Sequence, residues 1–274
     1  MFGTSVQQGS PVAARCCRDL ASVFAHAASG FGRPAPSQKI TIALFDVDDW
    51  LPWLAEAIAL LGADEAARVQ RRRFVADRNA LALAYALHRL LLAHVLGGNP
   101  AQVPLRRDDR GCPRLLGDAA YTSLSHAEGL IALAVTASGP VGVDIEPSAR
   151  AVVMAEIAHS VCHPSEAAEL SALDEWARCT AMLALWVRKE ALLKAAGIGL
   201  AVPMESFSAP SHHALRVPAL FADPAQVRML DAGAGCIAAV AGAPDAIVDC
   251  RWLRPLPGAL AASVAGVAGV DALP

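Results

Sequence analysis

The chain has 274 residues, 55% of them hydrophobic, and a formal net charge of −3 at pH 7. A chain of this length can bury a substantial core as one large domain or two smaller ones. The small negative charge argues against extensive nucleic-acid binding, although RVQRRRF at 68–74 leaves room for a local basic patch. The longest apolar stretch, at 80–98, contains His88 and Arg89 and is too short and too charged to predict a membrane span. We therefore expect neither nucleic acid nor membrane as a partner.

The cysteines and the two ends of the chain give further limits. The seven cysteines lack the CxxC pairs and neighbouring histidines of a zinc site, which favours reduced thiols and a cytoplasmic location. Asp19 interrupts the apolar run that a secretory signal would need. We predict a poorly ordered, Ser/Ala/Pro-rich extension at 1–38 and a similar Ala/Gly/Val-rich tail at 257–274.

The first half of the chain predicts strands around a long helix. KITIALFDV at 39–47 is rich in β-branched residues and predicts a first strand. Leu and Trp at helical spacing predict a helix at 51–61, and a short helix then leads into a long one that stops at Gly97-Gly98-Asn99-Pro100. YTSLSH and LIALAVTA predict two strands joined at Glu128-Gly129, and PVGVDIEP predicts another that ends at Pro147.

The second half repeats this order of elements. HPSEAAEL provides a helix-capping pattern, a long helix is predicted at 175–196, and strands are predicted within 204–254. We therefore predict an α+β fold with two pseudo-symmetric lobes, at 39–137 and 138–256. Each lobe would pack a small, mainly antiparallel sheet against a long helix, with the active site in the cleft between them.

The strand at VGVDIE places two carboxylates, Asp144 and Glu146, on one face. A solvated edge strand would explain this pair on its own. Glu190 and Lys194 lie four residues apart on the predicted helix, where an ordinary ion pair is the simplest interpretation. If the helix lies beside the strand, however, the three carboxylates repel one another unless a cation lies between them. Hard oxygen ligands of this kind suit Mg²⁺ together with phosphate oxygens.

These motifs, in this order, resemble those of the Sfp-type 4'-phosphopantetheinyl transferases, the two-lobe class with a W-x-x-K-E-A motif. VGVDIE is followed after about 40 residues by WVRKEALLKAAGIGLAVPMESFS, and SLSHAEGLIALAV precedes both. RRRFVADRNALALAYALHRLLL is similar to the N-terminal helix of the family, so the resemblance covers roughly residues 40–245. Two positions depart from the pattern: Val187 replaces a small polar residue, and Cys112 replaces the lysine of a G-K-P stretch.

The resemblance implies a reaction and a set of catalytic residues. The 4'-phosphopantetheine arm of coenzyme A would pass to a serine hydroxyl of an acyl or peptidyl carrier protein, with release of 3',5'-ADP. Asp144, Glu146 and Glu190 would hold Mg²⁺, and the catalytic residues would be Glu190, Lys194 and Asp144. Either Glu190 or a metal-bound water beside it would act as the base, and Lys194 would face the phosphate that gains charge. The carrier could serve fatty-acid, polyketide or nonribosomal-peptide synthesis, and the enzyme is expected to act as a monomer.

The resemblance also implies contacts to coenzyme A. The expected cofactor-binding residues are His126, Ser125, Arg73, Arg78, Arg114, Lys189 and Lys194. His126 would donate to the 3'-phosphate, although a histidine at the end of a strand is often structural. Arg114, Arg106 or Arg107 could replace the missing lysine. Lys189 could contact either a distal phosphate or a structural carboxylate, because it lies about 100° around the helix from Glu190.

Two alternatives to this enzyme remain. A catalytically silent coenzyme A or carrier-protein binding module of the same fold is one, and the joint presence of Asp144, Glu190 and Lys194 argues against it. An unrelated Mg²⁺-dependent nucleotide enzyme is the other. It is disfavoured because the sequence has neither a G-x-x-x-x-G-K-[ST] loop nor a G-x-G-x-x-G motif after a strand.

Overall fold

The helices and strands of the computed structural model follow the predicted order closely; it describes residues 19–32, 38–108, 110–117, 120–215 and 223–257. The α-helices are α1 (Leu20–Ala27), α2 (Val47–Trp50), α3 (Leu54–Ala59), α4 (Ala63–Gln70), α5 (Val75–Leu96), α6 (Ala158–Val161), α7 (Pro164–Ser171) and α8 (Glu175–Ala196). The 3₁₀ helices are η1 (Leu51–Trp53), η2 (Pro100–Gln102), η3 (Ser148–Ile157), η4 (Gly199–Ala201) and η5 (Met204–Ser206). The strands are β1 (Lys39–Asp46), β2 (Leu105–Arg107), β3 (Pro113–Leu115), β4 (Tyr121–Ala127), β5 (Leu130–Thr136), β6 (Gly142–Pro147), β7 (Ala214–Leu215), β8 (Ala225–Leu230), β9 (Cys236–Gly242) and β10 (Ile247–Trp252).

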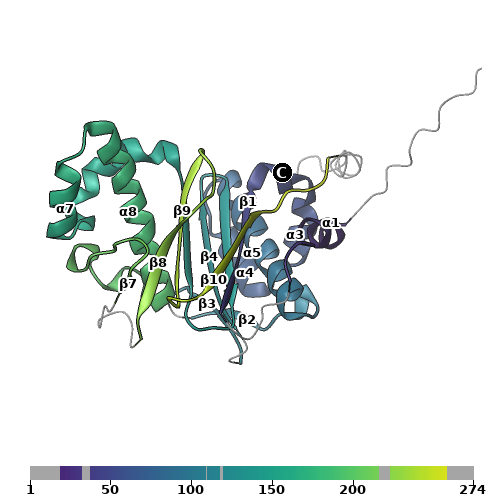
Figure 1. Cartoon of the computed structure of the whole chain (residues 1–274). Helices are drawn as coiled ribbons and strands as arrows, with labels where there is room; N and C mark the ends of the chain where they lie inside the picture. The colour runs from purple at the N-terminus through teal and green to yellow at the C-terminus, as the bar shows by residue number, and fades with distance from the viewer. Residues whose placement is uncertain (1–18, 33–37, 109, 118–119, 216–222, 258–274) are drawn as a thin grey trace, which may run out of the picture.

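Two four-stranded sheets lie between two layers of helices, which confirms the α+β class (Figure 1). The first sheet has the order β10-β1-β5-β4 and the second the order β6-β9-β8-β7, while β2 and β3 form a separate hairpin. All pairings are antiparallel except that of β1 with β10. In Figure 1, α7 and α8 lie on the left of the strands and α1, α3 and α5 on the right.

Strand alternation divides the core into layers, because successive side chains point to opposite faces of a sheet. On β1, Ile40, Ile42 and Leu44 pack against the second sheet, in a cluster that also contains Val143 and Ile145 of β6. Ala43 and Phe45 of β1 join the cluster that covers α5. The two sheets therefore share a continuous apolar interface rather than forming independent lobes.

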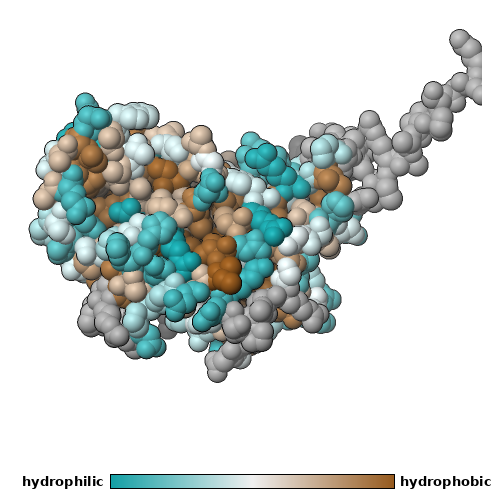
Figure 2. Space-filling view, viewed as in Figure 1, coloured by the Kyte–Doolittle hydropathy of each residue, from teal (hydrophilic) through white to brown (hydrophobic). Residues whose placement is uncertain are grey.

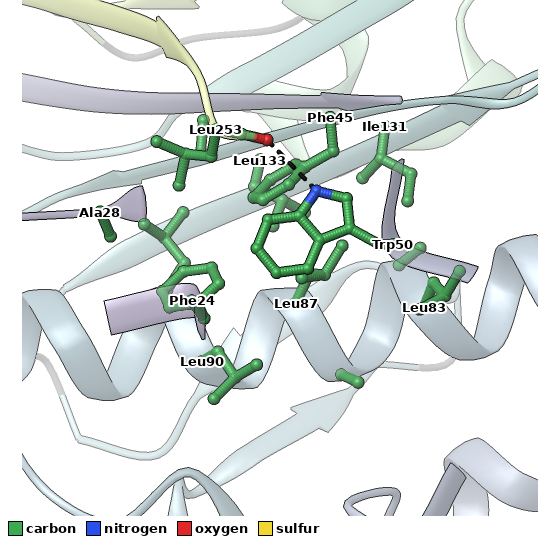
Figure 3. Close-up of a cluster of buried hydrophobic side chains, with 14 of the residues drawn as sticks. Phe24, Ala28, Phe45, Trp50, Leu83, Leu87, Leu90, Ile131, Leu133 and Leu253 are labelled. Carbon is green, nitrogen blue, oxygen red and sulfur yellow. Dashed lines mark hydrogen bonds between the residues drawn. The ribbon is translucent and has the colours of Figure 1, made fainter. Parts of the chain in front are cut away.

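The core beside α5 is rich in aromatic side chains. Trp50 lies between Phe24 and Phe45, and its indole Nε1 donates to the carbonyl oxygen of Leu253 at 3.2 Å (Figure 3). Phe24 belongs to α1, which lies within the region 1–38 predicted to be poorly ordered. That prediction is wrong for residues 20–27, because Leu20, Val23 and Phe24 form a buried helical stripe. Asp19 acts as the N-cap of this helix and accepts from the backbone N–H of Ser22.

The last strand crosses the predicted boundary between the lobes. β10 lies in the segment assigned to the C-terminal lobe, yet it pairs with β1 and forms an edge of the first sheet. Hydropathy along β10 did not indicate its partner, because a short strand carries no information on which sheet it joins. The tail predicted at 257–274 lies, beyond residue 257, outside the described residues.

Two observations concern contact with a membrane: the burial of the long apolar helix α5 and the distribution of hydrophobic side chains on the surface (Figure 2). Among the described residues, α5 is the one helix long and apolar enough to cross a membrane, and 78% of its most apolar window is buried inside the protein. It serves as the central helix of the first core. On the face seen in Figure 2, hydrophobic side chains occur in patches among hydrophilic ones.

Candidate active site

The site forms where β6 and α8 come into close contact. Asp144 and Glu146 point away from the interface between the sheets and are both buried. The approach is close because position 142 is glycine: a Cβ there would overlap the backbone carbonyl of Ala191 on α8. β6 is an edge strand, but Ser123 Oγ of β4 accepts from the Val143 N–H at 3.1 Å. The Ser123 hydroxyl thus accepts a hydrogen bond from a backbone N–H on the free edge of β6. The strand that carries Asp144 and Glu146 is therefore not exposed to solvent.

Three side chains from three elements meet at Asp144. The Lys194 Nζ lies 2.6 Å from Asp144 Oδ1 and donates to Ser125 Oγ at 2.8 Å. Ser125 Oγ in turn donates to the same Asp144 oxygen at 2.7 Å. Lys194 is therefore anchored on α8, and its ammonium group is held by hydrogen bonds to Ser125 on β4 and Asp144 on β6.

Glu146 and Glu190 add two further carboxylates. Glu146 Oε1 accepts from the Arg150 guanidinium at 2.5 Å, in an i,i+4 pair that leads into η3. Burial and the charge of Asp144 raise the pKa of Glu190 to about 7, against the lowering effect of Lys194. Burial also raises the pKa of Glu146. The simple Glu190–Lys194 ion pair considered for the sequence does not form, since Lys194 pairs with Asp144 instead.

Two of the three carboxylates have a cationic partner: Asp144 pairs with Lys194 and Glu146 pairs with Arg150. Within the described ranges, no three His, Cys, Asp or Glu side chains form a group arranged to hold a metal ion. Asp144 Oδ2 and Glu146 Oε2 are nevertheless buried without a hydrogen-bond partner. Buried carboxylate oxygens normally have partners, and burial together with the charge of Asp144 raises the pKa of Glu190. Carboxylate oxygens are ligands that Mg²⁺ accepts, so Asp144, Glu146 and Glu190 are the residues here that could hold one.

A cavity of about 370 Å³ opens beside this cluster. Glu190 and Lys194 of α8 line it together with Arg107, Cys112 and Arg114 of the β2–β3 hairpin and its loop. The cavity thus joins the acidic and basic groups of α8 to an arginine-rich wall. A substrate with phosphate groups could contact both at once.

The other predicted coenzyme A ligands are spread around this region. Arg114 lines the cavity and pairs with Asp108 at 3.0 Å. His126 is exposed and lines a neighbouring cavity with Arg72, and partial desolvation and the charge of Arg72 lower the pKa of its imidazole. Arg73 stacks on the ring of Phe74.

Arg78 differs from the prediction in its contacts. Its Nη1 donates to the backbone carbonyls of Arg72 and Arg73, at 3.1 and 3.2 Å. A guanidinium that donates to two carbonyls fixes the start of α5. The structure therefore gives Arg78 a local structural contact.

Lys189 is not available to a phosphate, so its prediction as a cofactor ligand is wrong. Its side chain is fully buried, and its Nζ donates to the carbonyl oxygens of Val161, Met204 and Phe207 at 2.7–2.8 Å. It also pairs with Glu166 at 2.6 Å. The structural carboxylate, one of the two partners considered for Lys189, is the one it contacts.

Sequence reasoning missed two partners of the site. Glu166 is the acidic residue of the HPSEAAEL capping pattern, and it accepts from the backbone N–H of His163 at 2.9 Å as well as from Lys189. Arg150 follows Glu146 by four residues, a spacing that would have predicted the pair if the segment after β6 had been recognised as helical.

The fold and the site together define a class: a two-sheet α+β protein with an acidic strand and a Lys/Glu helix beside a basic cavity. Comparisons with known sequences show which family this chain is similar to. Residues 140–240 match the 4'-phosphopantetheinyl transferase superfamily. This segment contains β6 and α8 and thus Asp144, Glu190 and Lys194.

Three curated relatives show how far the similarity extends. The chain is 31% identical over 153 residues to the 4'-phosphopantetheinyl transferase HetI of Nostoc sp., covering 54% of this chain and 64% of that protein. It is 29% identical over 153 residues to a 4'-phosphopantetheinyl transferase of Bacillus subtilis, covering 55% and 66%. It is 27% identical over 145 residues to a putative 4'-phosphopantetheinyl transferase of Synechocystis sp., covering 52% and 59%.

The matched segments span less than two thirds of each relative. The match to the 4'-phosphopantetheinyl transferase superfamily covers residues 140–240, which is less than half of the chain.

Proposed function

We propose that the protein is an Sfp-type transferase that moves the 4'-phosphopantetheine arm of coenzyme A onto a serine hydroxyl of an apo carrier protein. The serine oxygen forms a bond to the phosphorus that bears the arm, the bond to the leaving phosphate breaks, and 3',5'-ADP leaves. One observation carries the proposal: Glu190 and Lys194 line a cavity together with Arg107, Arg110 and Arg114, and Lys194 is held by the buried Asp144.

Glu190 is the proposed general base. A carboxyl group with a pKa of about 7 is partly ionised at neutral pH and accepts a proton more readily than an ordinary glutamate. A serine hydroxyl is a weak nucleophile until a base takes its proton. Glu190 can take this proton directly or through one water molecule, because its carboxylate lines the cavity.

Lys194 is proposed to face the phosphate. Its Nζ has two oxygen partners, Asp144 and Ser125, and one donor position remains for a phosphate oxygen. Because both partners are fixed on strands, the ammonium is preorganised where negative charge develops.

Asp144, Glu146 and Glu190 are the proposed Mg²⁺ ligands. The unpaired oxygens of Asp144 and Glu146 support this assignment. When bound, the ion would neutralise charge on the phosphate oxygens of coenzyme A. Arg150 and Lys194, which now balance the carboxylates, remain close enough to hold them in place without the ion.

The carrier is proposed to be an acyl or peptidyl carrier of fatty-acid, polyketide or nonribosomal-peptide synthesis. The enzyme is proposed to act as a monomer in the cytoplasm. Among the described cysteines, five are unpaired, which supports this location.

The test is intact-carrier mass spectrometry with coenzyme A, Mg²⁺ and a panel of apo carrier proteins. We expect one carrier class to gain one phosphopantetheine, and this gain to need both the metal and Glu190. Glu190→Gln should abolish the gain, while Glu205→Gln, at an exposed position, should not. Binding of coenzyme A without a mass gain on any carrier would favour the catalytically silent binding module instead.

A further inference from the structure

Arg107 lies on a wall shared by two cavities, with its guanidinium only partly satisfied. It is the last residue of β2, and its Nη1 donates to the carbonyl oxygen of Gly111 at 2.9 Å. Its Cζ lies 4.3 Å from the centre of the Tyr85 ring on α5. Among the described residues, its Nε and Nη2 have no hydrogen-bond partner although both atoms are buried. The Tyr85 ring and the Gly111 carbonyl thus fix the plane of the guanidinium, and the N–H groups of Nε and Nη2 are left without acceptors in the described part of the chain.

Two unused buried donors on a cation are energetically unfavourable. Nearly all buried polar groups in folded proteins are paired, and an unpaired charged group costs more than a neutral one. Burial lowers the pKa of Arg107, as expected for a cation without a compensating anion. A ligand with two adjacent anionic oxygens would satisfy both donors, because the guanidinium fork matches phosphate geometry.

The surroundings of Arg107 favour an anion. The second cavity has a volume of about 430 Å³ and is lined by Arg68, Arg71, Arg89, Arg106 and Arg107. Its acidic residues are Asp64 and Glu65, and Glu65 already pairs with Arg89 at 2.7 Å.

The first cavity carries the same excess of positive charge. Arg107, Arg110, Arg114 and Lys194 line it, together with the carboxyl group of Glu190. Cys112, in the same loop, adds no charge, because burial raises the pKa of its thiol. Arg107 is therefore the member of this basic wall that is fixed in orientation and lacks an anion.

We propose that Arg107 binds a phosphate group of the nucleotide end of coenzyme A through its Nε and Nη2, so that this end of the substrate lies between the two cavities. The inference rests on the proposed function, because coenzyme A is the substrate assumed there. It also explains how Lys194 and Arg107, which both line the first cavity, would act on different phosphates of one molecule.

The test is calorimetric titration of the full chain, without any carrier protein, using coenzyme A, dephospho-coenzyme A and 3',5'-ADP. Arg107→Met should weaken coenzyme A binding on the order of 10- to 100-fold, the range expected when charged hydrogen bonds are lost. Arg107→Lys should recover part of the affinity, because it keeps the charge but not the fork. Arg254→Met, which removes an exposed arginine elsewhere, should bind as the wild type does.

A second measurement separates a ligand-binding arginine from a structural one. Thermal unfolding of the ligand-free Arg107→Met variant should occur at or above the wild-type temperature, because an uncompensated buried charge has been removed. The proposal would be overturned if the unfolding temperature of Arg107→Met fell markedly and if Arg107→Lys lost as much affinity for coenzyme A as Arg107→Met.

The remaining outcomes also decide between the proposals. Dephospho-coenzyme A lacks the 3'-phosphate. If Arg107→Met does not weaken binding of this ligand, Arg107 contacts the 3'-phosphate; if it does, Arg107 contacts the diphosphate. Both results support the proposal. Wild-type affinity for coenzyme A in Arg107→Met overturns it even if the wild type modifies a carrier. Arg107-dependent binding without carrier modification would leave this inference standing and refute the proposed transfer. Wild-type protein that binds none of the three ligands overturns both.

Discussion

Replacing Glu190 by glutamine should stabilise the metal-free protein at alkaline pH while abolishing transfer. The pKa of Glu190 is raised to about 7 from an ordinary 4.5, mainly by burial and by the charge of Asp144. The folded state therefore holds a proton on Glu190 that the unfolded chain releases between pH 4.5 and 7, so stability falls as the pH rises through this window. At about 1.4 kcal/mol for each pKa unit, the ionised carboxylate costs about 3 kcal/mol above pH 7. Glutamine has the same shape and no charge, so it avoids this cost.

The assay is urea unfolding in EDTA between pH 4 and 8.5. The free energy of unfolding of Glu190→Gln should equal that of the wild type near pH 4 and exceed it by about 3 kcal/mol at pH 8. Glu205→Gln controls for the loss of one negative charge at an exposed position. Saturating Mg²⁺ should stabilise the wild type more than the variant, because the cation favours the ionised carboxylate. A difference between Glu190→Gln and wild type that does not change with pH would refute the electrostatic account of this site.

Three further changes test the scaffold. Lys189→Met should lower the free energy of unfolding by about 3–5 kcal/mol, because it leaves the buried Glu166 carboxylate without its cation. Chemical denaturation measures this change, and an unchanged free energy of unfolding would contradict it. Gly142→Ala should lower both the unfolding temperature and the rate of carrier modification, since the new methyl group overlaps the backbone of Ala191; an unchanged rate would show that β6 can move without loss. Burial lowers the pKa of His88 to about 3 from an ordinary 6.5, so the unfolded chain takes up a proton that the folded state excludes. The free energy of unfolding should therefore fall as the pH drops below 6.5, by up to about 1.4 kcal/mol per pH unit. His88→Gln should reduce this slope in acid-unfolding titrations, and equal slopes would count against it.

The sequence predicted the local elements well because their signals are local. Periodicity marked α5 and α8, β-branched residues marked β1, and the capping pattern before α7 gave its start. The partner of β10 could not be predicted, because pairing depends on contacts between residues more than 200 positions apart, such as Lys39 with Ile247. α1 was missed for a different reason. Its buried stripe is short and Ala-rich, and an aspartate at position 19 both interrupts an apolar run and caps a helix, so the residue alone does not indicate which.

The candidate site was predicted in outline but not in its pairings. The spacing of Asp144 and Glu146 gave their common face, and the family resemblance brought Glu190 and Lys194 to them. Charge alone could not say whether Lys194 would contact Glu190 on its own helix or Asp144 across the gap, because that depends on the distance between β6 and α8. Nor could it separate a buried lysine from an exposed one, so the sequence left both a phosphate and a structural carboxylate open as the partner of Lys189.

The parallel pairing of β10 with β1 has a consequence for synthesis of the chain. β1 leaves the ribosome well before β10, so its edge towards β10 stays unpaired until residues 247–252 have been translated. The bond from Trp50 to the carbonyl of Leu253 must form later still. A domain usually folds as its residues emerge. Here the first sheet is completed only after β10 has been made, so a nascent chain stalled before residue 247 would expose a hydrogen-bonding edge to other molecules.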